Sequence, residues 1–281
     1  MSILPDNPVI RERLFVAVKY ITYGWLTWNL YLFYLSEGLA ADVSFSGGLT
    51  LSQIVEIYSA TIDSTFWILL VILLELETYA IDDEILKRTW VKWTMIGLRT
   101  ICYTMIVYAL YGYIVKVAFQ SDILPFAVAN ACSLVDQSYT IILALEDYVP
   151  LTVDNCQALA GQELARLNGQ DIIGLRENLI YARNVSWIDI FNASTWLGVV
   201  VILEIDVWFQ LEGTFEGRLY RVSYIFKIIF YSILFACAVA WGITGVFLDF
   251  ADAALWLFAF FFIEMNLFQW QQETEAAEAA A

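Results

Sequence analysis

Histidine is absent from the chain, and basic residues are few. The 281 residues include 14 Lys and Arg against 30 Asp and Glu, which gives a formal net charge of −16 at pH 7. Without histidine, the chain has no haem site with histidine ligands, no histidine zinc site and no Ser–His or Cys–His nucleophile pair. The negative charge argues against nucleic acid as a partner and against a polybasic surface for anionic lipids.

Motifs of enzymes are missing as well. The sequence contains no P-loop, no G-x-S-x-G and no Cys/His cluster for a metal. We therefore expect neither an enzyme nor a bound cofactor, although a lipid-modifying enzyme that uses carboxylates alone stays open. Clustered acids between the apolar runs could attract Ca²⁺, but their spacing is not that of an EF-hand, so a metal remains unknown.

Cysteine is scarce, with four residues in the chain. Cys102 and Cys237 lie within apolar runs and are expected to pack as small apolar side chains. Cys132 and Cys156 flank a loop, and they could form a disulfide if that loop lies outside the cytosol.

Long apolar runs dominate what is present, since 60% of the residues are hydrophobic. A helix that crosses a bilayer needs roughly 20 apolar residues. The sequence predicts an all-α, polytopic transmembrane bundle in a single integral membrane domain, 1–281. The six predicted spans are 14–36, 64–82, 95–118, 193–211, 223–247 and 253–271. A seventh stretch, 123–145, has a polar middle and is borderline, and no strand-like alternation suggests a transmembrane barrel.

The distribution of Lys and Arg predicts the orientation. Arg11 and Arg13 precede the first span, Lys87, Arg88 and Lys92 follow the second, and Arg218 and Arg221 follow the fourth. Because basic residues mark cytoplasmic loops, six spans place both termini inside and the region 119–192 outside. We expect 123–145 to be re-entrant or to lie at the outer surface, although a crossing would give seven spans. The simple locations are a bacterial inner membrane, which we expect, and a eukaryotic plasma or endoplasmic-reticulum membrane.

Two hairpins, 64–118 and 193–247, look like repeats of each other. At an offset of 129 residues, Trp67 matches Trp196, Glu75 matches Glu204, and Lys92 matches Arg221. Polar and aromatic matches at one offset are hard to obtain by chance in an aliphatic sequence, which favours a duplication. The segments 49–63 and 174–192 are predicted to extend their spans outward as helices, and 272–281 is an acidic tail.

Carboxylates inside the spans are the strongest functional signal. A charge at the centre of a membrane helix costs roughly 2.5–3.5 kcal/mol, so each one needs a partner or a function. Five acids are predicted to lie at a similar depth in the inner half of the bundle: Glu75, Glu77, Glu204, Asp206 and Glu264. Three bases are predicted near the same level: Lys19, Arg99 and Lys227.

Hairpin geometry predicts that one acid of each pair forms an ion pair with the neighbouring helix. The midpoint of Glu77 and Arg99, and that of Glu204 and Lys227, both fall in basic turns, as two antiparallel helices require. Residues i and i+2 point about 200° apart, so one base cannot easily serve both acids of a pair. The excess of acid predicts a site for a monovalent or divalent cation, or for protons.

Two functions fit this pattern. The first is a cation or proton channel or transporter that uses the inner carboxylates. The alternative is a non-catalytic subunit of a larger membrane complex, in which the buried charges are ion pairs between helices. A homo-oligomer fits either function, and the lipid bilayer is the expected surrounding in both cases.

Overall fold

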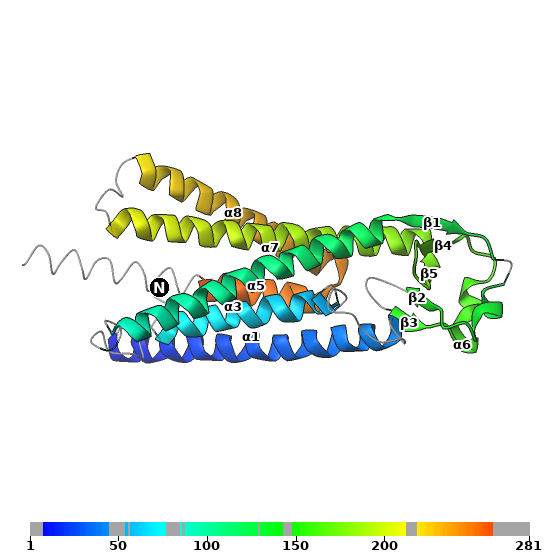
Figure 1. The fold of residues 1–281 in the computed structure, drawn as a ribbon, viewed down its shortest axis with the longest axis horizontal. Coiled ribbons are helices and arrows are strands. Elements are labelled where there is room, and N and C mark those ends of the chain that lie inside the picture. The colour runs from blue at the N-terminus through cyan, green and yellow to red at the C-terminus, as the bar shows by residue number, and fades with distance from the viewer. Residues whose placement is uncertain are drawn as a thin grey trace, which may run out of the picture. The chain divides into compact units, whose positions relative to one another are not determined.

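The computed structural model is predominantly helical, which confirms the predicted all-α class (Figure 1). It describes residues 8–44, 54–55, 57–76, 85, 88–128, 130–142, 148–211 and 218–260. The long helices are α1 (Pro8–Ser44), α3 (Ser59–Glu75), α5 (Thr89–Ser121), α7 (Arg176–Leu211) and α8 (Arg218–Thr244). Residues 247–260 are also helical. Glu77, Glu264 and the tail 272–281 lie outside the described residues.

The helices begin and end where the sequence allows it. Pro8 opens α1, a position at which the missing N–H of proline costs nothing. Gly245 ends α8 with φ +88°, and the N–H groups of Gly245 and Val246 both donate to the carbonyl of Trp241. A glycine in this left-handed conformation satisfies the last carbonyls of a helix and turns the chain sharply.

The chain divides into two compact units, residues 1–29 with 198–281 and residues 30–197. In the second unit α3 packs along α5, and Gly112 allows the closest approach. A Cβ at Gly112 would lie 2.7 Å from the carbonyl oxygen of Val55 and 3.2 Å from Cβ of Ser59. In the first unit Gly198 of α7 lies against the ring of Phe230 of α8, where a Cβ would lie 2.8 Å from the ring.

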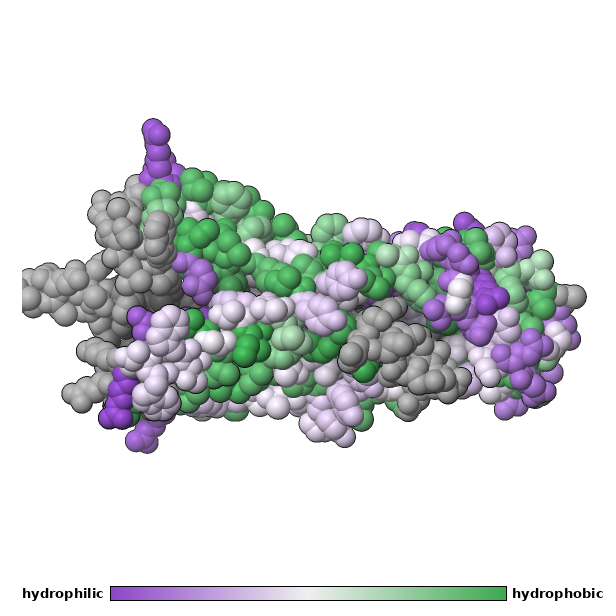
Figure 2. All heavy atoms as spheres, viewed as in Figure 1, coloured by the Kyte–Doolittle hydropathy of each residue, from purple (hydrophilic) through white to green (hydrophobic). Residues whose placement is uncertain are grey.

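Three of the described helices are long and apolar enough to cross a membrane, over Thr89–Ser121, Arg176–Asp206 and Arg221–Thr244. Large apolar side chains cover much of the surface over the helices, whereas polar residues gather over the sheet (Figure 2). Trp25, Trp28, Trp90 and Trp93 are each more than half exposed. Extensive exposed apolar surface of this kind marks contact with lipid or with partner chains.

A five-stranded sheet lies between α5 and α7, and the sequence analysis did not predict it. Its strand order is β1-β4-β5-β2-β3, antiparallel except for β2 beside β5. The strands are β1 (Ile123–Phe126), β2 (Thr140–Ile142), β3 (Tyr148–Pro150), β4 (Leu164–Leu167) and β5 (Ile172–Leu175). We call residues 122–175 the sheet domain. The stretch 123–145 thus contains β1, the 3₁₀ helix η2 (Ala131–Leu134) and β2, and its described residues form no membrane helix.

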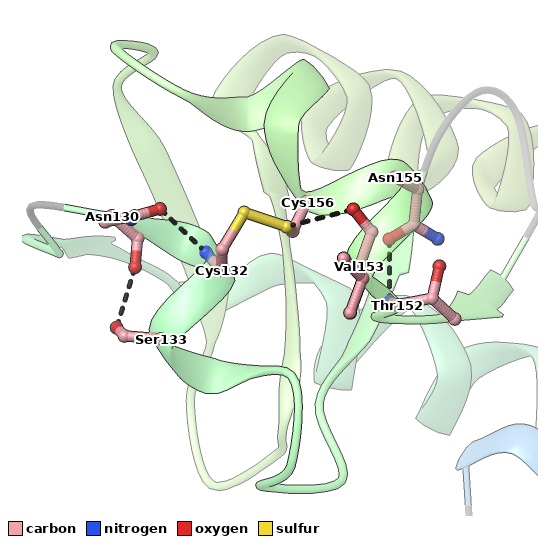
Figure 3. The surroundings of a disulfide bond; sticks show 7 residues. All are labelled: Asn130, Cys132, Ser133, Thr152, Val153, Asn155 and Cys156. Carbon is pink, nitrogen blue, oxygen red and sulfur yellow. Dashed lines mark hydrogen bonds between the residues drawn. A yellow bond between two sulfur atoms is a disulfide. The ribbon is translucent and has the colours of Figure 1, made fainter.

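The sheet domain has its own core and one disulfide (Figure 3). Cys132 of η2 is bonded to Cys156, the last residue of α6 (Val153–Cys156), and their Cα atoms are 4.9 Å apart. Asn130 accepts a hydrogen bond from the N–H of Cys132, and Asn155 accepts one from the N–H of Thr152. Both cysteines therefore lie on short turns whose backbone groups are satisfied.

A second apolar cluster joins the sheet to the helices. Ile142 of β2 and Leu167 of β4 are buried with Leu179 and Ala182 in the first turns of α7, and Phe119 of α5 packs against them. α7 then runs without a break from Arg176 to Leu211, so the predicted extension 174–192 is helical from residue 176 and continues into the predicted span 193–211. Cys102 and Cys237 are buried in α5 and α8 and remain thiols.

Candidate functional site

Asp206, near the C-terminal end of α7, forms an ion pair with the neighbouring helix α8. Its Oδ2 lies 2.9 Å from Nζ of Lys227, and the hydroxyl of Ser223 donates to the same oxygen at 2.7 Å. Ser223 and Lys227 are one helical turn apart on α8, so both face α7. The Asp206 side chain is 4% exposed and that of Lys227 is 23% exposed. Two donors thus hold one carboxylate oxygen in a largely buried place.

The other oxygen of Asp206 has a different environment. Oδ1 is buried and has no hydrogen-bond partner among the described residues. Nearly all buried polar atoms in proteins are hydrogen-bonded, so an orphan acceptor calls for an explanation such as a water molecule or an ion. Asp206 is therefore held through Oδ2, whereas its buried Oδ1 has no donor within the part of the chain that the structure describes.

The remaining predicted site residues lie in different surroundings. On α7, Glu204 is exposed, as expected from a position two residues and about 200° from the buried Asp206. Glu75 at the end of α3 and Arg99 of α5 are partly buried, and Lys19 of α1 is 5% exposed with Nζ 5.1 Å from the ring centre of Tyr20. Lys19, Glu204, Asp206 and Lys227 belong to one unit, whereas Glu75 and Arg99 belong to the other. The described contacts thus bring Asp206 and Lys227 together.

Two buried carboxylates were not predicted from the sequence as site residues. Glu37 of α1 accepts hydrogen bonds from the N–H groups of Ala60 (2.9 Å) and Thr61 (3.0 Å) and from the Thr61 hydroxyl (2.5 Å). It thereby caps the first turn of α3, whose N–H groups need acceptors. Glu37 follows the predicted span 14–36, and burial raises its pKa to about 7 against the opposing effect of its hydrogen bonds and of Lys116.

Asp252 is the second such carboxylate, and it lies between the predicted spans 223–247 and 253–271. Nδ2 of Asn29 in α1 donates to its Oδ1 at 3.1 Å, and Trp256 one turn further along is also hydrogen-bonded to it. Burial raises the pKa of Asp252 to about 7, although both hydrogen bonds act in the other direction. Asn29, 2% exposed, thus ties α1 to the helix 247–260.

A sequence signal for the contact between Asp252 and Trp256 was available. Asp63 and Trp67 of α3 have the same four-residue spacing as Asp252 and Trp256, and Nε1 of Trp67 donates to Asp63 at 3.0 Å. An Asp followed four residues later by a Trp places both side chains on one face of a helix, within hydrogen-bonding reach.

A second ion pair lies near the sheet domain. Nζ of Lys116 on α5 is 3.6 Å from Asp189 on α7, with side-chain exposures of 23% and 13%.

Within the described ranges no group of three Cys, Asp or Glu side chains is arranged as metal ligands. No protein-family model, curated protein or solved structure matches the chain.

Proposed function

We propose that the chain is a multi-pass membrane protein that conducts or transports a cation or a proton past carboxylates in the inner half of its helices. The observation that carries this proposal is the buried Oδ1 of Asp206, which has no hydrogen-bond partner among the described residues. A buried carboxylate oxygen without a donor is costly, and a cation, a proton or a water molecule in transit would satisfy it. Lys227 and Ser223 then act as positioning residues, because they fix the carboxylate through Oδ2 alone.

The disulfide supports the orientation that this proposal needs. Disulfides persist on the oxidising side of a membrane, so the sheet domain belongs outside the cytosol. α5 and α7 contain 33 and 36 residues. At about 1.5 Å per residue, each is roughly 50 Å long, which exceeds the 30 Å apolar core of a bilayer and leaves helix to carry the domain outside.

Basic residues lie where α5 and α8 begin. Arg88 and Lys92 lie at the start of α5, and Arg218 and Arg221 lie at the start of α8. Basic residues at these ends favour the cytoplasmic side, which supports an inner-membrane location with six spans and both termini inside. Asp206 and Lys227 then lie near the cytoplasmic surface.

Ion flux in proteoliposomes tests the proposal. Purified protein would be reconstituted and challenged with gradients of H⁺, Na⁺, K⁺ and Ca²⁺, beside the Asp206→Asn variant. The matched control is Asp189→Asn, which removes an ion-paired carboxylate from the same helix near the sheet domain. We expect Asp206→Asn to lower the flux and Asp189→Asn to leave it unchanged. Undiminished flux in a folded Asp206→Asn variant would refute a role for this carboxylate in transport.

A second candidate function is a non-transporting subunit of a membrane complex or homo-oligomer. The Lys227–Asp206 pair favours it, because a neutralised buried acid serves as a tie between helices. The disulfide-bonded sheet domain favours it as well, since such a domain suits contact with partners outside the cytosol. Absence of flux for all four ions, together with a solubilised assembly whose native mass exceeds that of one chain, would support this function over transport.

A further inference from the structure

The described contacts of Asp252 are with hydrogen-bond donors. Nδ2 of Asn29 donates to its Oδ1 at 3.1 Å, and the side chain of Trp256, one turn further along the helix, is hydrogen-bonded to the same carboxyl group. An indole N–H can only donate, so Trp256 offers no oxygen to a metal ion. Asn29 and Trp256 are both buried, and they fix the carboxyl group between α1 and the helix 247–260.

No charged group is among the causes that set the pKa of Asp252. Burial raises this pKa to about 7, and its two hydrogen bonds act against burial. On the described helices beside it, the bases nearest in sequence are Lys19, ten positions before Asn29 on α1, and Lys227 on α8. Its own helix carries one further described acid, Asp249, three positions earlier. A carboxyl group in this setting binds a proton near neutral pH, because no base offsets the cost of its ionisation.

Asp206 belongs to the same compact unit as Asp252 and has one oxygen to offer. Its Oδ2 accepts from Ser223 and is paired with Lys227, whereas its buried Oδ1 has no donor among the described residues. A metal cation such as K⁺ or Ca²⁺ is held by several carboxylate or carbonyl oxygens at once. The described contacts of both carboxyl groups are instead to N–H and O–H donors, and a proton needs only a single oxygen.

A buried donor in the same unit points to water. Nε1 of Trp241 on α8 has no acceptor among the described residues, although the residue is 4% exposed. Its neighbour Gly242 packs against the helix of Asp252, where a Cβ would lie 3.3 Å from the ring of Phe250. Buried polar atoms without a protein partner are commonly satisfied by ordered water. Water at this level of α8 would serve proton transfer, because a proton passes readily along a chain of water molecules.

The two carboxyl groups lie at different levels of this unit. α8 runs from Lys227, which is paired with Asp206, to Gly245, 18 positions later. The chain then turns, and Asp252 lies seven positions back along the next helix. At about 1.5 Å per residue, the two carboxyl groups are roughly 15–20 Å apart along the direction of α8. In the proposed orientation Asp252 is the outer one and Asp206 the inner one.

We infer that the transported cation is the proton, which binds to Asp252 near the outer ends of the helices and to Asp206 near their inner ends. This inference rests on the proposed transport function and names its ion. The ionised carboxyl group of Asp252 takes up H⁺ and becomes a neutral acid, and it is ionised again when H⁺ leaves, so that one O–H bond is formed and then broken. Asp206 receives the proton on Oδ1, while Lys227 and Ser223 hold its Oδ2.

Proton flux in proteoliposomes of the full-length protein tests the inference, with Asp252→Asn beside the wild type. Asn keeps the shape of a protonated Asp but does not bind or release H⁺. Since a positioned acid or base contributes about a hundredfold or more to a proton transfer, we expect Asp252→Asn to lower H⁺ flux about a hundredfold. The matched control is Asp249→Asn, three positions earlier on the same helix, which should leave H⁺ flux unchanged.

Trp256→Phe tests whether Asp252 is the group that titrates. Loss of the indole N–H removes a donor that favours the ionised carboxylate, so the pKa of Asp252 should rise and the pH dependence of H⁺ flux should shift to higher pH. Trp67→Phe is the control, because Trp67 donates to Asp63 in the other compact unit. A merely structural role of Trp256 would lower the flux at every pH without this shift, and that result would overturn the inference.

Infrared spectroscopy of the solubilised protein measures proton binding without flux. The C=O band of protonated carboxyl groups should titrate near pH 7 in the wild type. Because Glu37 titrates in the same range, the contribution of Asp252 is the part that is lost in Asp252→Asn but kept in Glu37→Gln. A titrating band that is the same in the wild type and in Asp252→Asn would overturn the inference.

Failure of the inference and failure of the proposed function give different results. Flux of Na⁺, K⁺ or Ca²⁺ without H⁺ flux, lost in Asp206→Asn, would overturn the inference and leave the transport proposal standing. H⁺ flux that is undiminished in a folded Asp252→Asn variant would do the same. Absence of flux for all four ions would overturn the transport proposal and the inference with it.

Discussion

Replacing Lys227 by Met removes the base that neutralises Asp206. Asp206 would keep only the hydroxyl of Ser223 on its Oδ2, in a place where its side chain is 4% exposed. Removal of one partner from a buried ion pair costs about 3–5 kcal/mol. Because the Lys227 side chain is 23% exposed, we expect the lower end of that range, about 3 kcal/mol.

Thermal unfolding in detergent, followed by tryptophan fluorescence, would measure this cost. At about 2–4 °C per kcal/mol for a chain of this size class, Lys227→Met should lower Tm by roughly 10 °C. Lys116→Met is the matched control, since the Lys116 side chain is equally exposed but its Nζ lies 3.6 Å from Asp189 rather than 2.9 Å from its acid. That looser pair should lose about 1 kcal/mol or less.

The double variant Asp206→Asn/Lys227→Met completes the test. Without the buried charge, the desolvation cost disappears, and most of the lost stability should return. Equal Tm losses for Lys227→Met and Lys116→Met would refute the reasoning. A double variant whose Tm loss equals the sum of the losses of Lys227→Met and Asp206→Asn would refute it as well, because the two side chains would then not be coupled.

Three further predictions concern other parts of the chain. Cys132→Ser/Cys156→Ser opens a link between residues 24 positions apart, so the sheet domain should lose about 3.5 kcal/mol and become sensitive to protease in intact proteoliposomes; unchanged resistance would contradict this. Gly112→Ala should destabilise the α3–α5 contact by about 1–3 kcal/mol in thermal unfolding, whereas Gly97→Ala on the same helix has open space and should be neutral or slightly stabilising; the reverse order would be inconsistent with the packing. Because burial raises the pKa of Glu37 and of Asp252 to about 7, the folded protein binds these protons more tightly than the unfolded chain, and stability should fall as pH rises from about 5 to 8. Glu37→Gln should reduce that fall in Tm-against-pH curves, and a stability that rises over this interval would count against the raised pKa values.

The helices were predictable from the sequence because a long apolar run has few alternatives to a helix. The hairpin argument placed Lys227 at the level of Glu204 and Asp206. In the structure Lys227 forms its ion pair with Asp206, and Ser223, one turn from Lys227 on α8, donates a hydrogen bond to the same carboxylate. Periodicity alone could not choose between the two acids, because the choice depends on the rotation of α7 about its axis.

The sheet domain was not predictable in the same way. Its strands contain only three or four residues, which is too short for an alternating pattern to be visible. Apolar residues of β1 and β2, buried by the sheet and by α7, gave 123–145 the composition of a weak membrane span. Glu37 and Asp252 were missed for another reason, since Thr61 and Asn29, which donate hydrogen bonds to them, come from distant parts of the chain.

The hydrogen bond between Asn29 and Asp252 also bears on how the chain is made. Its two residues are 223 positions apart, so the first helix is synthesised long before its partner exists. At about 5–20 residues per second, about 10–45 seconds pass between the synthesis of Asn29 and that of Asp252. During this time the side-chain amide of Asn29 lacks its partner. A ribosome that stops before residue 252 would leave the first helix joined to α3 through Glu37 but without the partner of Asn29.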